Sequence, residues 1–163
     1  FGGFTISCME KGKAHSLRLM PEKPLKFIAV VPDSKLPTTL ARQAIPASVP
    51  HHDAVYNTSR ASLLVGALLS GHYEYLGMAL EDKLHQPYRA HLIPGLQDVF
   101  EAARAAGAYN AIISGAGSTV MAYASPKADC ERIAQSMVQT FAKYGEHACY
   151  HILDIDKDGV KKL

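Results

Sequence analysis

The sequence predicts a mixed α+β domain in which an antiparallel sheet carries helices packed on one side, in a ferredoxin-like arrangement. Apolar, β-branched runs of strand length stand near both ends of the chain, and amphipathic stretches of helix length fill its middle. The last third also has the order strand, loop, strand, helix, strand, which is typical of ferredoxin-like folds. With 163 residues, 48% of them hydrophobic, the chain can bury a core as one domain.

The first three expected strands lie in the N-terminal part. Residues 3–9 are apolar and β-branched, residues 15–20 alternate like a hairpin partner, and Lys11-Gly12-Lys13 provides the turn between them. Residues 25–31 form a nearly unbroken apolar run, which predicts a buried central strand.

Four helices are expected in the middle of the chain. The predicted ranges are 38–44, 53–69, 73–84 and 96–106. Gly71 stands where the second of these helices would take a C-terminal cap, and Pro87 ends the third. The first helix is short because Pro46 halts it.

The C-terminal part is expected to hold three strands and one helix. The strands are predicted at 109–113, 119–124 and 147–155. Ser125-Pro126 predicts the helix start, because Ser is a good N-cap and Pro fits the first helical turn. Gly145 ends this helix, which carries apolar residues on one face.

Charge and cysteine content exclude several classes of protein. A formal net charge of +2, from 17 basic and 15 acidic residues, gives no electrostatic case for nucleic acid or for an anionic membrane. No apolar run reaches the length of a membrane span. The three cysteines, Cys8, Cys130 and Cys149, have no close spacing, which argues against a disulfide framework or a zinc site. We therefore expect a cytoplasmic protein.

A glycine-rich loop is the sharpest local feature of the sequence. It consists of Ser114, Gly115, Ala116, Gly117 and Ser118. Glycine permits a positive φ and lets backbone amides approach a phosphate or carboxylate. The loop lacks the Lys of a P-loop, and a strand is expected to follow it, so neither a P-loop nor a dinucleotide fingerprint fits. The motif alone favours a tight hairpin turn over a phosphate site.

Three side chains are candidates for binding a carboxylate. Thr38 and Arg42 stand four apart and share one face of a predicted helix, and Arg89 follows the helix breaker Pro87. Guanidinium groups bind carboxylates through paired hydrogen bonds, so two converging arginines would suit an amino-acid substrate. Ordinary surface arginines are the alternative and, from these residues alone, the more common outcome.

Metal ligands and a catalytic base are not predicted. No two of the eight histidines stand four apart within an expected helix, which a helical metal site would require. Residues 154–159 match the first half of a calcium loop, but no Glu follows to close it, so we expect a solvated turn. The sequence therefore predicts neither a catalytic residue nor a metal site.

Three segments resemble one family. Residues 112–120 (IISGAGSTV) resemble the third motif of the GHMP family of small-molecule kinases. Residues 82–89 (DKLHQPYR), the following 92–95 (LIPG), and 52–61 (HDAVYNTSRA) are similar to the homoserine kinases within that family. The resemblance covers nearly the whole chain in the family's order, so it outweighs the interpretation of the loop as a turn alone.

The resemblance implies an activity and a set of roles. The activity is transfer of the ATP γ-phosphate to the hydroxyl of L-homoserine, which gives O-phospho-L-homoserine in threonine biosynthesis. Thr38, Arg42 and Arg89 match positions that contact homoserine, and the arginines hold its α-carboxylate. The Ser114–Ser118 loop shapes the site near the phosphates. Two residues depart from the family pattern: Ser118 stands where Pro is usual, and Pro37 stands where Ser often precedes the Thr.

The resemblance also sets expectations about the rest of the protein. The family's ATP-binding loop, of PxxxGLGSS type, does not occur here, so ATP and Mg²⁺ are expected to be bound mainly by an N-terminal part that this chain lacks. We expect residues 1–163 to form one C-terminal domain, with 1–31 as the trailing strands of the N-terminal domain. The isolated chain is then expected to be inactive.

Two other functions stay open at this point. One is another GHMP kinase, of the mevalonate type, and the other is a non-catalytic ferredoxin-like module that binds an amino acid. The oligomeric state is also open, with a homodimer as one alternative.

Overall fold

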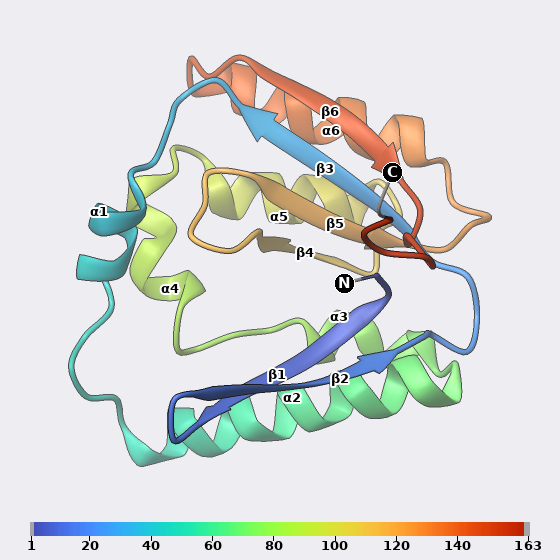
Figure 1. Cartoon of the computed structure of the whole chain (residues 1–163). Helices are drawn as coiled ribbons and strands as arrows, with labels where there is room; N and C mark the ends of the chain where they lie inside the picture. Colours follow the sequence, from blue (N-terminus) through green and yellow to red (C-terminus); the bar gives the residue numbers. More distant parts are fainter. Residues whose placement is uncertain (1, 162–163) are drawn as a thin grey trace.

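The computed structural model describes residues 2–161 and shows a sheet, several helices and a separate hairpin (Figure 1). Phe1 and residues 162 and 163, at the ends of the expected domain, lie outside the described residues. The elements are β1 (Phe4–Glu10), β2 (Lys13–Leu19), β3 (Lys26–Pro32), α1 (Thr38–Gln43), α2 (His51–Ser70), η1 (Tyr73–Tyr75), α3 (Leu76–Ala79), α4 (Gln86–Arg89), η2 (Ala90–Leu92), α5 (Leu96–Ala105), β4 (Asn110–Ile113), β5 (Val120–Ala124), α6 (Cys130–Lys143) and β6 (Ala148–Leu153).

The main sheet has four strands in the order β4-β5-β3-β6, and every neighbouring pair is antiparallel. The apolar run around β3 lies in the middle, where Ile28 pairs with Ala122 of β5 on one side and Ile152 of β6 on the other. With α5 and α6, these strands make a β-α-β-β-α-β unit of the ferredoxin-like kind. The predicted α+β fold class is therefore confirmed.

One face of the sheet packs against α5 and α6. Ile28 and Val30 of β3 are fully buried in this cluster. They meet the apolar stripe of α6, in which Ile133, Met137 and Phe141 recur at helical spacing and are all fully buried. This layer holds the larger part of the core, and it fixes the position of β4 and β5, which carry the glycine-rich loop between them.

The opposite face of the sheet is contacted at one end by α2, η1 and α3. Phe27 of β3 and Tyr123 of β5 meet edge to face at 4.9 Å and pack with Leu68 near the end of α2. Tyr73 accepts a hydrogen bond from the backbone N–H of Lys23 at 3.0 Å and donates one to its carbonyl. The long segment between β3 and α5 is thereby anchored to the sheet.

The third predicted helix is shorter than expected. Residues 73–84 form the 3₁₀ turn η1 and the single-turn helix α3, which ends at Ala79. After α3, Asp82 accepts hydrogen bonds from three backbone N–H groups that follow it, and this turn leads the chain into α4.

The predicted start of α6 is wrong. The helix begins at Cys130, because the Asp129 side chain caps it by accepting a hydrogen bond from the N–H of Arg132 at 3.0 Å. Ser125 instead closes a separate turn, in which its carbonyl accepts from the N–H of Ala128 at 2.9 Å. Asp is as good an N-cap residue as Ser, and the observed side-chain cap places the start of the helix after Asp129.

The hairpin β1–β2 forms a two-stranded sheet of its own (Figure 1). Most of its side chains are exposed, and it touches the main sheet through Phe4, whose ring lies 5.9 Å from that of Phe27. Strand β3 pairs on both sides within the main sheet. The assignment of residues 1–31 to a preceding domain stays a prediction. Between residues 2 and 161, no helix has the length and apolarity to cross a bilayer.

Candidate active site

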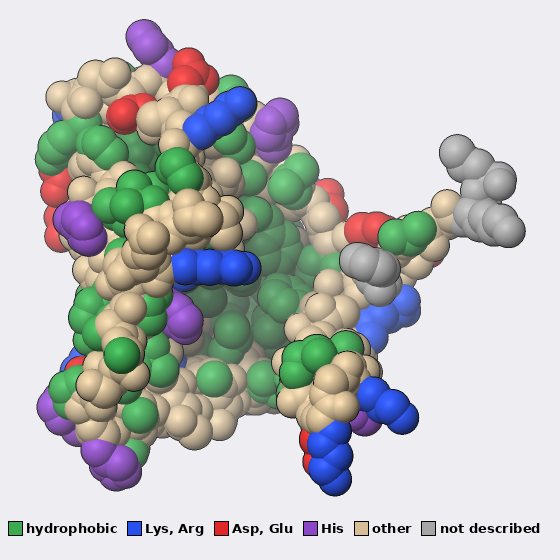
Figure 2. Space-filling view, turned by 60° about the vertical axis from the view of Figure 1, so that its left-hand side comes forward, with side chains coloured by type: hydrophobic (Ala, Val, Ile, Leu, Met, Phe, Trp, Pro, Cys, Tyr) green, Lys and Arg blue, Asp and Glu red, His purple; other side chains and the backbone are tan. Residues whose placement is uncertain are grey.

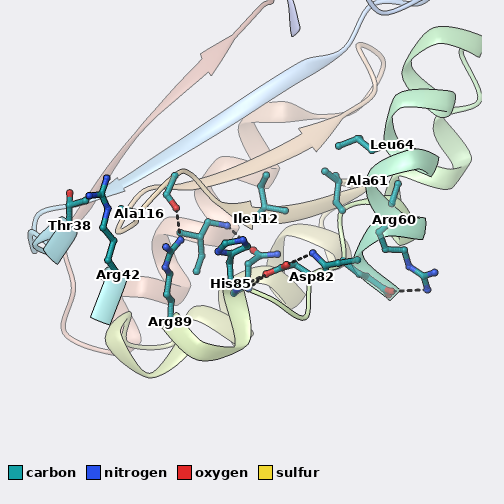
Figure 3. A pocket seen from close by; sticks show the side chains of 17 residues that line it. Thr38, Arg42, Arg60, Ala61, Leu64, Asp82, His85, Arg89, Ile112 and Ala116 are labelled. Carbon is teal, nitrogen blue, oxygen red and sulfur yellow. Dashed lines mark hydrogen bonds and ion pairs between the residues drawn. The ribbon is translucent and has the colours of Figure 1, made fainter. Parts of the chain in front are cut away.

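A cavity of about 560 Å³ lies between α1, α2, α4 and the glycine-rich loop. It opens into a hollow with a largely hydrophobic interior on this side of the molecule (Figure 2). Its walls include all three predicted carboxylate-binding side chains, Thr38, Arg42 and Arg89, and two residues of the loop, Gly115 and Ala116 (Figure 3). The fold thus brings together residues that are far apart in the sequence.

Helix α1 presents Thr38 and Arg42 to the cavity from one face, as their spacing predicts. Thr38 is the first residue of the helix, so the unusual Pro37 before it serves as an extended N-cap and leaves the start in place. The Arg42 side chain is exposed, and its guanidinium has no hydrogen-bond or ion-pair partner among residues 2–161. Arg42 is therefore free to bind an anion.

Arg89 is held differently, at the end of α4. Its Nε donates to the carbonyl of Ala41 in α1 at 3.0 Å, and its Nη1 donates to the carbonyl of Gly115 in the loop at 3.0 Å. One side chain thus ties three walls of the cavity together. Its Nη2 has no partner within the described part of the chain and can still donate to a ligand.

The glycine-rich loop is a tight turn, as its motif alone predicts, and it also forms part of the cavity wall. The N–H of Gly117 donates to the carbonyl of Ser114 at 3.1 Å. Gly115 has φ +60°, and a Cβ added there would meet no heavy atom within 4 Å, so the backbone at this point is open to a ligand. Ser118 donates its hydroxyl to the carbonyl of Ser34 at 2.8 Å, which fastens the loop where the family usually has Pro.

Asp82 lies in the wall of the cavity and accepts four hydrogen bonds. Burial opposes its charge, but hydrogen bonds from the N–H of Gln86, the amide of Asn57 and the N–H groups of Leu84 and His85 outweigh burial. The pKa of Asp82 is therefore lowered from its ordinary value. The carboxyl is ionised at neutral pH, with all its acceptor positions occupied by the protein.

The end of the cavity away from Arg42 and Arg89 holds a third arginine, Arg60. Arg60 of α2 lies 4.0 Å over the ring of Tyr56 and 3.5 Å from a carboxylate oxygen of Glu81, to which Tyr56 also donates its hydroxyl. Figure 3 shows Arg60 at the opposite side of the site from Arg42 and Arg89. Because Arg60 is already paired with Glu81, the accessible positive charge is concentrated at the Arg42 end.

Several cavity residues were not identified from the sequence as site residues. They are Asn57, Arg60, Glu81, Asp82, His85 and Gln86. Asp is a favoured first residue of turns because its side chain accepts from the backbone N–H two residues on, as Asp82 does from Leu84, so Asp82 could have been found as a turn residue. Ser114, Gly117 and Ser118 were also predicted to shape the site; they are not among the lining residues, and their hydrogen bonds hold the loop in place.

The arrangement suits a small ligand with a carboxylate. Arg42 and the free edge of Arg89 stand beside a hydroxyl, that of Thr38, and beside the exposed loop backbone. Leu64 and Ile112 add an apolar part of the wall, against which a short carbon chain can lie. Within residues 2–161, no group of three or more His, Cys, Asp and Glu side chains is placed to hold a metal ion.

Comparison with known proteins defines the class. Residues 64–143 match the family model described as "GHMP kinases C terminal", and the chain carries the C-terminal domain of a GHMP kinase. Within that class, the chain is 38% identical over 162 residues to the homoserine kinase of Caldanaerobacter subterraneus subsp. tengcongensis. That alignment covers 99% of this chain and 52% of the relative.

Solved structures show the same fold. The crystal structure of homoserine kinase from Cytophaga hutchinsonii matches with a TM-score of 0.89 at 25% identity, over 96% of this chain and 50% of that one. The mevalonate kinase of L. major, solved in complex with R-mevalonate, matches with a TM-score of 0.73 at 16% identity, over 99% and 51% of the two chains. At that identity the second likeness concerns the fold alone. The chain spans about half the length of the relatives it matches.

Proposed function

We propose that the protein to which this chain belongs is a homoserine kinase, which transfers the γ-phosphate of ATP to the hydroxyl of L-homoserine. The observation that carries the proposal is the meeting of Arg42, Arg89 and Thr38 with the glycine-rich loop at one cavity. The similarity to proteins named homoserine kinase over 99% of this chain supports the choice of acceptor. The product, O-phospho-L-homoserine, places the reaction in threonine biosynthesis, in the cytoplasm.

In this proposal the chain binds and orients the acceptor. Arg42 and the free Nη2 of Arg89 bind the α-carboxylate, and the Thr38 hydroxyl hydrogen-bonds to the same end of the molecule. The acceptor hydroxyl is thereby directed toward the phosphoryl group that ATP supplies. Positioning and the stabilisation of spread negative charge account for most of the catalysis of phosphoryl transfer.

The nucleotide and the metal are assigned mainly to another part of the protein. The exposed backbone at Gly115 and Ala116 is the part of this chain that we place near the phosphates. We assign the Mg²⁺ ligands to that other part and none to the residues described here. On this division of roles, the chain alone has no kinase activity.

The alternative is a GHMP kinase of the mevalonate type. The likeness to the L. major enzyme shows that the fold does not separate the two. The separation depends on the acceptor site, where the sequence similarity favours homoserine.

A panel of acceptors tests the proposed function. The full-length protein, expressed from the complete reading frame, is mixed with ATP and Mg²⁺, and ADP release is followed with L-homoserine, L-serine or mevalonate. We expect release with L-homoserine and little with L-serine, which has the same carboxylate and ammonium groups but one methylene fewer. ADP release with mevalonate alone would show that the acceptor is mevalonate and not L-homoserine. ADP release with none of the three acceptors would refute the proposed kinase activity.

A further inference from the structure

The carboxylate of Asp82 joins helix α2 to the turn that leads into α4, two segments that the tertiary fold brings together. It follows α3, and its two oxygens accept hydrogen bonds from three backbone N–H groups of the turn that leads into α4: those of Leu84 at 3.0 Å, His85 at 2.8 Å and Gln86. The fourth hydrogen bond comes from Nδ2 of Asn57 in α2, at 2.7 Å. Asn57 Oδ1 in turn accepts from the N–H of Lys83 at 2.7 Å. The Asp82–Asn57 pair thus fixes the turn to α2 from both sides.

That turn determines where α4 stands, and α4 is tied to the rest of the cavity. Gln86 Oε1 accepts a hydrogen bond from the N–H of Ile113 at 2.8 Å, at the base of the glycine-rich loop. Arg89, one helical turn further on, donates to the carbonyl groups of Ala41 and Gly115. A shift of the turn would therefore move Arg89 and release the base of the loop together.

We propose that Asp82, held by Asn57, is a positioning residue for acceptor binding in the kinase. It acts through α4, by fixing Arg89 and the loop at the distances that carboxylate binding requires. Since both its oxygens are occupied by the protein, Asp82 does not bind the substrate itself. This inference rests on the proposed function and adds to it a residue that carries no substrate contact.

The role requires a carboxylate at position 82 and an amide at position 57. An amide at 82 would keep one acceptor oxygen and turn an NH₂ group toward backbone N–H groups, so two or more hydrogen bonds would be lost. A carboxylate at 57 would stand within hydrogen-bond distance of the Asp82 carboxylate, and two such groups cannot both ionise without strong repulsion.

The first test is Asp82→Asn in the full-length protein. We expect KM for L-homoserine to rise by about tenfold or more and kcat to fall, with KM for ATP close to wild type, because a small displacement of a positioning group has large kinetic effects. Asp156→Asn is the matched control: Asp156 also accepts two backbone N–H groups of a turn, at Asp158 and Gly159, but lies outside the cavity. Equal kinetics for Asp82→Asn and wild type would overturn the proposal.

The second test is the pH dependence of Asn57→Asp. At low pH the new carboxyl stays protonated and donates to Asp82 as the amide does, whereas at high pH both carboxyl groups ionise and repel each other. We expect the ratio of KM for L-homoserine between variant and wild type to be near one at the lower pH and to rise by about tenfold at the higher pH. Dividing by the wild-type KM at each pH removes the effect of other titrating groups on substrate binding. The charged residues that line the cavities beside Asp82 or pair with its turn are Asp53, Arg60, Glu81, Lys83, His85, Arg89 and Arg104.

The outcomes separate this inference from the proposed function. Homoserine turnover by the wild-type protein reports on the proposed function, whereas the ratio of variant to wild type reports on Asp82 and Asn57. A KM ratio for Asn57→Asp that does not change with pH, together with a lower melting temperature at every pH, would mean a structural role only and would overturn the inference. Absence of homoserine turnover by the wild type would overturn both.

Discussion

Replacing Arg42 with Ala in the full-length protein is expected to raise KM for L-homoserine by about 100-fold, or about 3 kcal/mol of binding free energy. The guanidinium is exposed at the cavity and has no hydrogen-bond or ion-pair partner within residues 2–161, so the substitution removes the proposed carboxylate contact without breaking a hydrogen bond of the described fold. The melting temperature and KM for ATP should therefore stay at wild-type values. Steady-state kinetics and thermal unfolding measure the two effects.

Two further variants serve as controls for this prediction. Arg42→Lys keeps the charge but loses the paired hydrogen bonds, so we expect it to recover part of the affinity. Arg132→Ala removes an exposed arginine at the start of α6, away from the cavity, and should leave KM for L-homoserine unchanged. If Arg42→Ala and Arg132→Ala have the same KM, Arg42 does not bind the acceptor.

Arg89→Ala is expected to have the larger effect, a loss of about 1000-fold in kcat/KM for L-homoserine. The variant would lose the proposed contact of Arg89 with the substrate carboxylate. It would also lose the hydrogen bonds from Arg89 to the carbonyl groups of Ala41 and Gly115, which align α1 and the loop. Because those two bonds stabilise the fold, the melting temperature should fall as well, and kcat should fall along with the rise in KM. The same kinetic and thermal measurements apply.

Arg89→Lys separates the two roles. One ammonium group cannot reproduce the forked geometry that reaches both backbone carbonyls, so we expect little recovery of kcat, in contrast to Arg42→Lys. A variant Arg89→Ala with wild-type stability and an effect confined to KM would show that the ties to α1 and the loop are unimportant.

The fold was predictable from the sequence where a single local pattern was present and no other signal competed with it. The apolar run at 25–31 became the central strand, and the spacing of Ile133, Met137 and Phe141 gave the buried face of α6. The start of α6 was mispredicted because Ser125-Pro126 and Asp129 are both start signals, and only side-chain geometry decides between them. The third helix was overextended: α3 ends at Ala79, and residues 82–86 form a turn held by the hydrogen bonds of Asp82.

The site was predictable in part. Helical spacing placed Thr38 and Arg42 on one face, and the structure shows both at the cavity. Arg89 was grouped with them as a second arginine beside a helix-breaking proline, and the family resemblance favoured this set over the alternative of ordinary surface arginines. Asn57 and Asp82 lie 25 positions apart, and their contact depends on how α2 packs beside the turn before α4. Such long-range contacts leave no periodic trace in a single sequence.

The most direct test of the account compares L-homoserine with 3-amino-1-propanol, which is homoserine without its carboxylate, in the wild-type full-length protein and in Arg42→Ala. We expect loss of the carboxylate to lower kcat/KM by about 100-fold or more in the wild type and by much less in the variant, because the group that binds the carboxylate is already gone. An equal penalty in both proteins would show that Arg42 does not bind the acceptor carboxylate and would contradict the proposed acceptor site.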